Sequence, residues 1–600
     1  MKVKRNPNEP ISNLEIGSII EVDGTHIVAE LDPKITELTR VYGGIIYPIG
    51  QFGSIIKIHF GARLIFGYVG RLRMKSEYER EKGLSPELGG TARIIEADLF
   101  GDGEWAFDNE EWKLDFERGV TTFPLPQQKV YLTPRAELGF IYGEGTGPTI
   151  LLGEHVGSGG TPCYAEMNDL LGKHTAILGS TGSGKSGTVA ALLHSIRDRG
   201  KDANHAKWHP QIVVLDPHNE YGTAFPSHVR LCTDEDSLCL PYWLLNLEET
   251  VSLFIGKAED AATSQTNIVM NALWKARQEG AKKIGIDENS ITVDSPIPYF
   301  IGDPYGLDEL GNKNGIRNVD HGFVGAVNSL RPDGQDKKKH EGYTKVLRKV
   351  ESLCRDSRKI FMMKEWDGSN DPLPGVVKQF IGDSDPVRIV DLSGVPNEVA
   401  GAASSAIART LFSVKLWQTR EERESNPVLL VCEEAHRYVP NRGEAQYEAA
   451  QEAIRRLAKE GRKYGIGLIL VSQRPSEVEA TVLSQCNSWI VLRITNDSDR
   501  SHVQGILPDS LAGLTRVLSG LRRREAIFVG QAAVLPSRIL IRDLIKDGKP
   551  LPRSQDINYD TGWQSDPITD EHLADVGKRW RLQSRQVKKC NNGSDKGADS

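Results

Sequence analysis

The feature that most constrains this chain is the run GSTGSGKS at positions 179–186, which matches the phosphate-binding pattern G-x-x-x-x-G-K-[ST]. The run HTAIL at 174–178 is typical of a short buried strand, and TVAALLHSI at 188–196 is typical of a helix. Glycines let the backbone curl until its N–H groups point at a phosphate, and the helix N-terminus adds a positive dipole end. Because strand, loop and helix stand in the required order, the sequence predicts a nucleoside triphosphate site.

The residues of this loop have distinct expected roles. Lys185 would hold the β- and γ-phosphates, and the hydroxyl of Ser186 would ligate Mg²⁺. The base-reading motif of GTPases, Asn-Lys-x-Asp, is not found, because the nearest string, NKNG at 312–315, lacks the aspartate. ATP is therefore favoured, by elimination. The residues predicted to bind the nucleotide are Gly179, Ser180, Thr181, Gly182, Ser183, Gly184, Lys185, Ser186 and Gly187.

Length and composition limit the number of domains, the cellular location and the kinds of partner that this chain can have. A chain of 600 residues is too long for one core, so about three domains are expected. No apolar run is long enough for a membrane span, and the first residues lack an apolar segment, which predicts a cytoplasmic protein without membrane contact. The seven cysteines include no C-x-x-C pair, which argues against a zinc site or a disulfide framework. Because the net charge is −7, any contact with nucleic acid must come from a local basic surface.

The first part of the chain has the pattern of a small β domain. Between about residues 10 and 150, short runs of alternating apolar and polar residues are separated by glycines, as at 17–22, 53–60 and 63–69. This spacing predicts a closed N-terminal β-barrel over residues 1–150. Residues 153–162 include four glycines, and we expect a linker there.

The remainder predicts an α/β fold with a parallel, doubly wound sheet over residues 151–570. A long segment of helices and loops, residues 240–385, interrupts the strand pattern and reads as an inserted helical subdomain. Residues 571–600 are polar, and we expect a disordered tail. Besides the strand before the phosphate loop, the predicted buried strands are 212–216, 387–392, 428–432, 467–472 and 489–493.

Carboxylates and an amide follow two of these strands. The strand VLLVC at 428–432 ends in Glu433 and Glu434; the first would lie near the water shell of Mg²⁺ and the second would activate the attacking water. Read alone, two glutamates at a strand end could be exposed capping residues, but the phosphate loop favours catalysis. Gln473 ends the next strand and would sense the γ-phosphate or orient water; a simple strand-end cap is an open alternative.

A basic helix is predicted over residues 445–464. Its small and apolar side chains share one face, and Arg462 lies in its last turn. One interpretation is structural, since cations in a last turn are stabilised by the helix dipole. The other interpretation makes Arg462 an arginine finger that reaches the nucleotide of a neighbouring subunit. This role requires a ring of subunits.

Five motifs in this order resemble the HerA helicase and translocase family of the FtsK/HerA group. The motifs are GSTGSGKS, DPHNEY at 216–221, CEEAHRYVP at 432–440, EGRKYGIGLILVSQRP at 460–475 and RITN at 493–496. The resemblance covers about residues 15–545, and the first strands are similar to the HAS β-barrel of that family. It differs at Glu433, where related P-loop ATPases often have Asp, and at Asn219, where relatives commonly have Gly.

The resemblance implies a RecA-like P-loop ATPase core in a homohexameric ring that threads double-stranded DNA. It places ATP and Mg²⁺ at subunit interfaces, with Arg462 acting in trans, and it implies a partner: a nuclease of the NurA type, or a Sir2-like or other effector in antiphage defence. The expected DNA contacts are residues 437–442 and the segment after Gln473, which have no base-reading signature, so binding would be independent of sequence. Two alternatives stay open: a motor for conjugative or protein transfer, and a scaffold that uses ATP for assembly and presents an effector.

Overall fold

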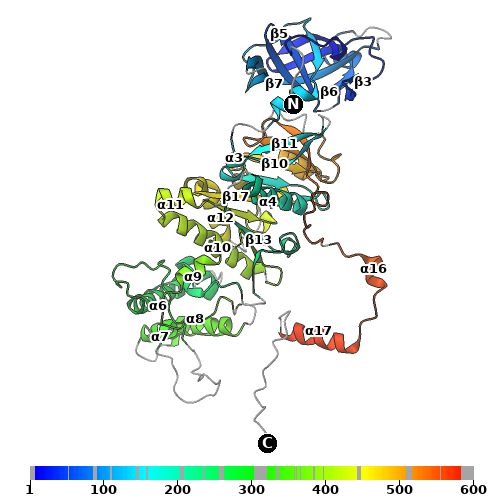
Figure 1. Cartoon of the computed structure of the whole chain (residues 1–600). Coiled ribbons are helices and arrows are strands. Elements are labelled where there is room, and N and C mark those ends of the chain that lie inside the picture. The colour runs from blue at the N-terminus through cyan, green and yellow to red at the C-terminus, as the bar shows by residue number, and fades with distance from the viewer. Residues whose placement is uncertain are drawn as a thin grey trace, which may run out of the picture.

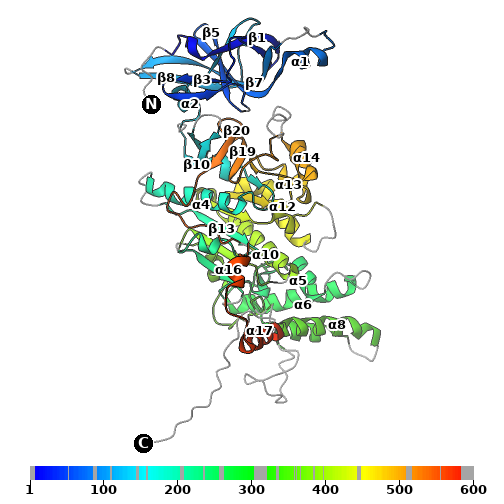
Figure 2. The ribbon, with the colours of Figure 1, turned by 90° about the vertical axis from the view of Figure 1, so that its right-hand side faces the viewer.

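The computed structural model has a β-barrel, a large sheet covered by helices, and a group of helices, in that order along its length (Figures 1 and 2). No helix among the described residues is long and apolar enough to cross a membrane. The structure describes residues 7–51, 53–85, 91–108, 111–143, 147–156, 160–202, 208–233, 237–255, 262–302, 321–332, 337–356, 359, 361–364, 366–382, 385–395, 397–441, 448–507, 517–554 and 556–582.

The N-terminal strands form the predicted closed barrel. Strand β2 pairs with both β1 and β7, which closes a ring of six strands in the order β2-β1-β9-β5-β6-β7, and β8 (Glu111–Arg118) extends it beside β7. Alternate side chains point inward, such as Ile56 and Ile58 of β5, because successive residues of a strand face opposite sides. The barrel strands are β1 (Glu15–Asp23), β2 (His26–Leu31), β5 (Ile55–Phe60), β6 (Arg63–Met74), β7 (Arg93–Asp108) and β9 (Lys129–Leu132).

The second body contains an eleven-stranded sheet in the order β11-β10-β20-β19-β18-β12-β17-β16-β13-β15-β14. Seven neighbouring strands, from β18 to β14, are parallel, as predicted. These are β12 (Thr175–Leu178), β13 (Gln211–Asp216), β14 (Val229–Cys232), β15 (Val387–Asp391), β16 (Val428–Cys432), β17 (Ile466–Ser472) and β18 (Ser488–Leu492).

The other four strands are antiparallel, so the sheet is mixed rather than wholly parallel. They are β10 (Thr149–His155), β11 (Thr161–Glu166), β19 (Glu525–Gly530) and β20 (Ser537–Ile541). The connections between β10 and β11 and between β19 and β20 are far shorter than the dozen or more residues that a parallel crossover needs. Short connections therefore force antiparallel pairing of β10 with β11 and of β19 with β20.

The linker expected at 153–162 is strand at 153–155 and at 161–162, and residues 157–159 lie outside the described part of the chain. Gly153 lies inside β10, where a Cβ atom would stand 2.0 Å from the carbonyl oxygen of Leu540 in β20. The pairing register with β11 shifts between Leu151 and Gly153. The glycine thus permits a close strand approach at a bulge, and its presence was mistaken for a sign of a linker.

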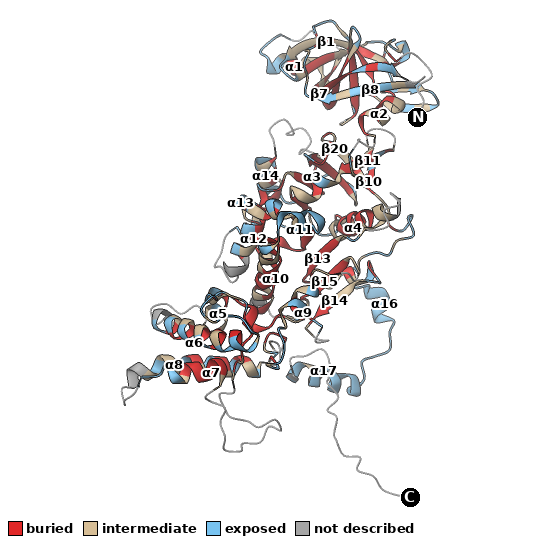
Figure 3. Ribbon diagram, turned by 60° about the vertical axis from the view of Figure 1, so that its left-hand side comes forward, coloured by how far each residue is buried: buried red, intermediate tan, exposed pale blue. Residues whose placement is uncertain are grey.

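Helices cover both faces of the parallel strands (Figure 3). In β12, Ala176 and Leu178 belong to one apolar core, together with helices α10 (Asn397–Trp417) and α12 (Glu448–Glu460). Ile177, between them, belongs to the other core, together with α4 (Lys185–Asp202). A strand buried on both faces reads as a continuous apolar run, which is why β12, β13, β16 and β17 were recognisable in the sequence.

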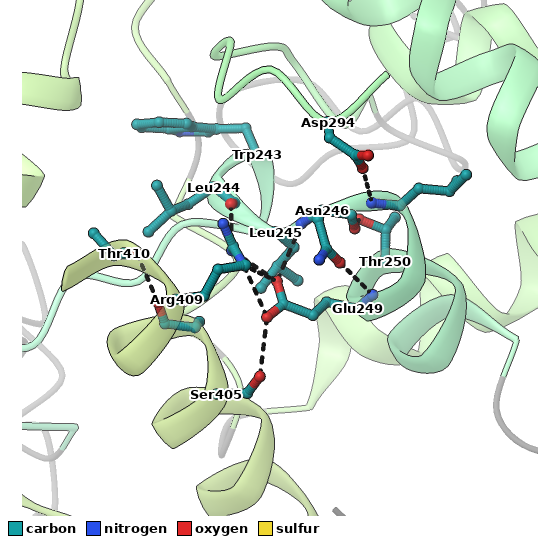
Figure 4. Close-up of polar contacts among 12 residues, drawn as sticks. Trp243, Leu244, Leu245, Asn246, Glu249, Thr250, Asp294, Ser405, Arg409 and Thr410 are labelled. Carbon is teal, nitrogen blue, oxygen red and sulfur yellow. Dashed lines mark hydrogen bonds and ion pairs between the residues drawn. The ribbon is translucent and has the colours of Figure 1, made fainter. Parts of the chain in front are cut away.

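The inserted helices lie between β14 and β15 and are joined to the sheet body by a partly buried ion pair (Figure 4). Arg409 of α10 donates to both carboxylate oxygens of Glu249 at 2.7–3.0 Å and to the carbonyl of Leu244 at 2.7 Å. Ser405 adds a bond to Glu249 at 3.1 Å, so the carboxylate is well paired. The insertion contains α5 (Leu247–Phe254), α6 (Ala262–Lys283), α7 (Gly322–Ser329), α8 (Lys337–Arg355) and α9 (Leu373–Lys378).

Two helical predictions need correction. The basic helix expected over 445–464 is α12 from Glu448 to Glu460, followed by a 3₁₀ turn over Gly461–Tyr464, and residues 445–447 lie outside the described part of the chain. The tail expected to be disordered from 571 begins with a helix, α17 (Asp570–Leu582). Acidic residues in its first turn and arginines in its last turn stabilise it through the helix dipole. The prediction for 583–600 falls outside the described residues.

Candidate nucleotide site

The phosphate loop joins β12 to α4, which begins at Lys185. Gly182 and Gly184 have φ angles of +74° and +105°, a region that other residues enter at a cost, so these glycines allow the loop to curl. Lys185 Nζ lies over the loop, 3.3 Å from the carbonyl oxygen of Ser180. The loop and the helix N-terminus have the form of a phosphate cradle.

The residues around the loop come from distant parts of the chain. Ser180 N donates to the carbonyl of Arg493 at 2.9 Å, and Thr495 N donates to Ser180 Oγ at 3.1 Å. The backbone N–H of Arg524 donates to Ser183 O at 3.0 Å, and Arg524 has a φ angle of +66°. The RITN motif therefore supports the phosphate loop from the adjacent strand.

Gln473 contacts the phosphate loop directly. Thr181 Oγ1 donates to Gln473 Oε1 at 2.7 Å, and the Gln473 backbone makes a hydrogen bond to the carboxylate of Glu434. Gln473 follows β17, which pairs in parallel with β12 so that Ser472 lies opposite Leu178. The amide thus lies between the loop and the carboxylates.

The two glutamates after β16 lie in different environments. Both are nearly buried, with 6% and 7% of Glu433 and Glu434 exposed. The hydroxyl of Tyr221 donates to Glu433 Oε1, whereas Glu434 Oε2 is buried without a hydrogen bond from the described residues. Glu434 also has a left-handed backbone with φ +52° and ψ +53°. Such strain in a residue other than glycine is concentrated at functional sites.

Burial and crowding of carboxylates raise the pKa of both groups. Burial is the main cause of the raised pKa of Glu433, and the charges of Glu434 and Glu220 add to it. Burial also raises the pKa of Glu434, while the cations Lys185 and Arg437 lower it. The pKa of Lys185 is lowered, mainly because the side chain is buried. The negative charges of Glu434 and Glu433 act in the opposite direction but are the smaller effect. The ionised forms of Glu433 and Glu434 are therefore disfavoured by burial, and a nearby cation would stabilise them.

The DPHNEY segment supports Glu433, because its Tyr221 contacts both Glu433 and Asp216. Asp216 Oδ2 accepts from Tyr221 N at 3.0 Å, and burial raises the pKa of Asp216 to about 7. Asn219 has a φ angle of +55°. Asn tolerates this left-handed conformation better than most residues other than glycine, so its departure from the family pattern needs no change of backbone.

Two histidines face Glu434. His436 Nδ1 lies 3.4 Å from Glu434 Oε2, and His218 Nε2 lies 4.0 Å from Oε1. Burial lowers the pKa of His436 to about 4 and also lowers that of His218. Both rings are therefore neutral near pH 7 and provide no imidazolium partner for Glu434.

The donor atoms present fit a bound Mg²⁺. The hydroxyl of Ser186 and the unpaired carboxylate oxygen of Glu434 are hard oxygen donors of the kind that Mg²⁺ takes, and Glu433 adds a second carboxylate. Mg²⁺ usually keeps several waters and binds one or two carboxylates together with phosphates. This environment is compatible with Ser186 as a direct ligand and Glu433 as a ligand through water.

Arg462 is the predicted site residue that the fold does not bring to the loop. It lies before the first residue of β17, whereas Gln473 follows the last, so the two are separated by the length of a seven-residue strand, about 20 Å. Arg462 is exposed and lines a cavity of about 580 Å³ at the end of the sheet where β17 begins. Within one subunit it cannot reach the phosphate loop.

The two predicted DNA-contact segments lie side by side. A β-bridge joins Pro440 to Val478, and Asn441 N donates to the carbonyl of Glu477 at 2.7 Å. Arg437 Nη2 is 3.3 Å from His218 Nε2, which connects this surface to the nucleotide site. Arg442 lies outside the described residues.

Sequence reasoning missed several residues of the site. Tyr221 and Asp216 were quoted within a motif but were given no role, and Arg524 was not noticed. No local sequence pattern indicates which distant group a tyrosine hydroxyl contacts in the fold. Arg524 is one of three consecutive arginines before β19, which was the available signal.

The phosphate loop, the buried carboxylates and the intervening amide define a P-loop ATPase. In a comparison with known protein families, residues 150–411 match the family model described as helicase HerA, central domain. A DNA double-strand break repair helicase HerA of Sulfurisphaera tokodaii is 27% identical over 423 residues, covering 70% of this chain and 73% of that protein. A probable helicase of Methanocaldococcus jannaschii is 26% identical over 441 residues, covering 71% and 76%.

The chain is thus similar to HerA helicases over about 70% of its length, and it is an ATP-hydrolysing enzyme. The HerA protein of Sulfolobus acidocaldarius shows a similar relation, 26% identity over 70% of this chain and 73% of its own length. The solved structure of VirB4 of Thermoanaerobacter pseudethanolicus is 16% identical, covers 68% of this chain and 99% of its own, and has a TM-score of 0.46.

Proposed function

We propose that the protein is a ring-shaped, ATP-driven translocase or helicase for double-stranded DNA. The observation that carries this proposal is the position of Arg462, at the sheet edge opposite the phosphate loop. If Arg462 contributes to hydrolysis, the nucleotide it serves belongs to another subunit, and hydrolysis depends on the neighbouring subunit as a ring motor requires. We take the ring to be a homohexamer acting in the cytoplasm.

In this proposal the residues of one subunit bind and activate the nucleotide. The loop N–H groups and Lys185 hold the phosphates, and Ser186 with Glu433 would hold Mg²⁺, which neutralises charge on the β- and γ-phosphates. Glu434 accepts a proton from the attacking water. Gln473 orients that water, because its side chain already contacts the loop and its backbone contacts Glu434.

The DNA is bound through its phosphates. Residues 437–441 and 474–479 form one surface next to the nucleotide site, and Arg474 on it is exposed although it pairs with Glu477 at 2.7 Å. A change at Glu434 can reach this surface through Arg437 and His218. Recognition by phosphate contacts alone is independent of base sequence.

A partner protein is also part of the proposal. The relatives are described as double-strand break repair helicases, which suits work beside a nuclease of the NurA type at DNA ends. An antiphage role with a Sir2-like or other effector is the second form of the same proposal. Co-purification of the protein from its native cells, with identification of the bound chain, distinguishes these forms.

The central experiment measures ATPase activity and DNA binding together. We expect double-stranded DNA of any sequence to stimulate ATPase, and the log of affinity to fall with log salt by about 0.9 per neutralised phosphate. Lys185→Ala should abolish turnover with and without DNA, which is the control for contaminating ATPases. Stimulation by neither linear nor circular duplex, with the partner present, would contradict the proposal and favour the scaffold alternative.

A further inference from the structure

Helix α8 presents a row of cations that the nucleotide site does not use. Its nineteen residues, KKKHEGYTKVLRKVESLCR, include seven Lys or Arg and two Glu, in a chain whose net charge is −7. Of these cations, Lys345, Arg348, Lys349 and Arg355 are exposed. A concentration of positive charge in an acidic chain creates a local field that attracts anions.

The exposed cations of α8 all point away from the core, because the opposite face of the helix is buried. Val346, Val350 and Leu353 are at most 2% exposed and belong to the main apolar core. Residues three, four and seven apart share a helix face, so Lys345, Arg348 and Lys349 stand together. These side chains therefore point away from the core.

Several other cations of this subdomain serve its own structure. Lys282 pairs with Glu288 at 2.6 Å, Lys283 lies over the ring of Phe300 at 4.3 Å, and Lys275 donates to Ser329 at 2.8 Å. On α8, Lys345 pairs with Glu341 at 2.8 Å and Arg355 lies 3.6 Å from Glu351, whereas the described residues provide no acidic partner for Arg348 or Lys349. Arg348 and Lys349 point outward and are therefore available for an external ligand.

We propose that this face of α8, defined by Lys345, Arg348, Lys349 and Arg355, is a second contact surface for the phosphate backbone of duplex DNA. The four residues span about 15 Å of helix. Duplex DNA carries about one negative charge per 1.7 Å of axis, so several phosphates fall within that span. This inference rests on the proposed function.

The test is the double charge reversal Arg348→Glu with Lys349→Glu in the full-length chain. Binding to two unrelated duplexes is measured by fluorescence anisotropy across salt concentrations. We expect affinity at low salt to fall about tenfold or more, and the slope of log affinity against log salt to decrease by about 2. ATPase without DNA and the urea midpoint should be unchanged, because both side chains are exposed and neither lies near the nucleotide.

The matched control is Lys34→Glu with Arg420→Glu, which changes the net charge equally at exposed positions of the barrel and of helix α11 (Arg420–Ser425). An equal loss of affinity in this control would overturn the inference, since the effect would then belong to total charge. Wild-type DNA binding by the α8 variant would also overturn it and would leave an acidic protein as the partner of this face. If the wild-type protein itself binds no duplex DNA, this result contradicts the proposed function as a whole, and not only the role of α8.

Discussion

At the scale of single residues, Glu434 is the most constrained group in the site. Its backbone is left-handed, its Oε2 atom is buried without a hydrogen bond, and its pKa is raised, first by burial. An unpaired buried oxygen costs about 1–3 kcal/mol, and the fold retains it beside the phosphate loop. This combination is typical of a group whose partner is the substrate.

Glu434→Gln should preserve ATP binding and reduce turnover by about 10² or more, because the amide fills the same space but cannot accept the proton of water. Steady-state ATPase and binding of a fluorescent ATP analogue measure the two effects separately. Glu477→Gln, at an exposed carboxylate paired with Arg474, is the control and should have nearly normal turnover. Normal turnover in Glu434→Gln would show that another group is the base.

His174, directly before β12, makes the fold sensitive to acid. Its Nδ1 accepts from Leu468 N at 3.1 Å, and burial lowers its pKa to about 4 from 6.5. The unfolded chain therefore binds a proton first as pH falls, so this stabilisation is present above pH 6.5 and is lost between 6.5 and 4.

His174→Asn should reduce that loss by up to about 3 kcal/mol, because Asn keeps an acceptor and tolerates the φ angle of +59° without titrating. Urea unfolding at several pH values between 7 and 4 measures the difference from the wild type. His209→Asn, at an exposed ring, is the control. Parallel pH profiles for His174→Asn and the wild type would disprove this account.

At the scale of elements, β17 separates two predicted catalytic groups. Gln473 follows its last residue and contacts the loop, while Arg462 precedes its first residue at the opposite edge. A parallel strand carries groups at its two ends to different surfaces of the sheet. Gln473 therefore lies at the phosphate loop of its own subunit, and we propose that Arg462 serves the nucleotide of another subunit.

Arg462→Ala should reduce turnover by about 10³ or more while nucleotide affinity stays near normal, because a finger acts on the charge of the transition state. Mixing this variant with Lys185→Ala subunits tests action in trans, since some interfaces then combine an intact Arg462 with an intact loop. Partial recovery of ATPase is expected. No recovery in mixed assemblies would make Arg462 a structural residue.

At the scale of the whole molecule, the C-terminal arm contains many of the exposed large apolar side chains of the described residues. The arm comprises residues 551–582, with helices α16 (Tyr559–Trp563) and α17, and stands away from the sheet in two views (Figures 1 and 3). Its base is fixed near the nucleotide site, where Arg553 N donates to the carbonyl of Glu220 at 2.8 Å. Its exposed apolar residues include Leu551, Ile557, Tyr559, Trp563, Ile568 and Leu573.

Apolar surface of this extent is typical of an interface, and a neighbouring subunit is the expected partner. Trp563→Ser with Leu573→Ser should shift the assembly to smaller species, as measured by light scattering after size-exclusion chromatography. Trp563 is 82% exposed and Leu573 54%, so the urea midpoint of the isolated subunit should change little. An unchanged assembly size would exclude these residues from the interface.

The sequence alone determined the features that depend on neighbouring residues. The phosphate loop, the apolar strands around it and the carboxylates after β16 are local patterns, because backbone conformation and strand burial are encoded within a few positions. The barrel was likewise predictable from alternating runs, since the period of a strand fixes which side chains face inward.

Only the tertiary structure decided which distant groups meet. Tyr221 donates to Glu433 across 212 positions of the chain, and Thr181 reaches Gln473 across 292. The antiparallel edge, the left-handed Glu434 and the separation of Arg462 from the loop also depend on strand order and register. Strand order is set by the packing of the whole core, and no short segment contains that information, which is why the site was predicted as separate parts and became a connected network in the fold.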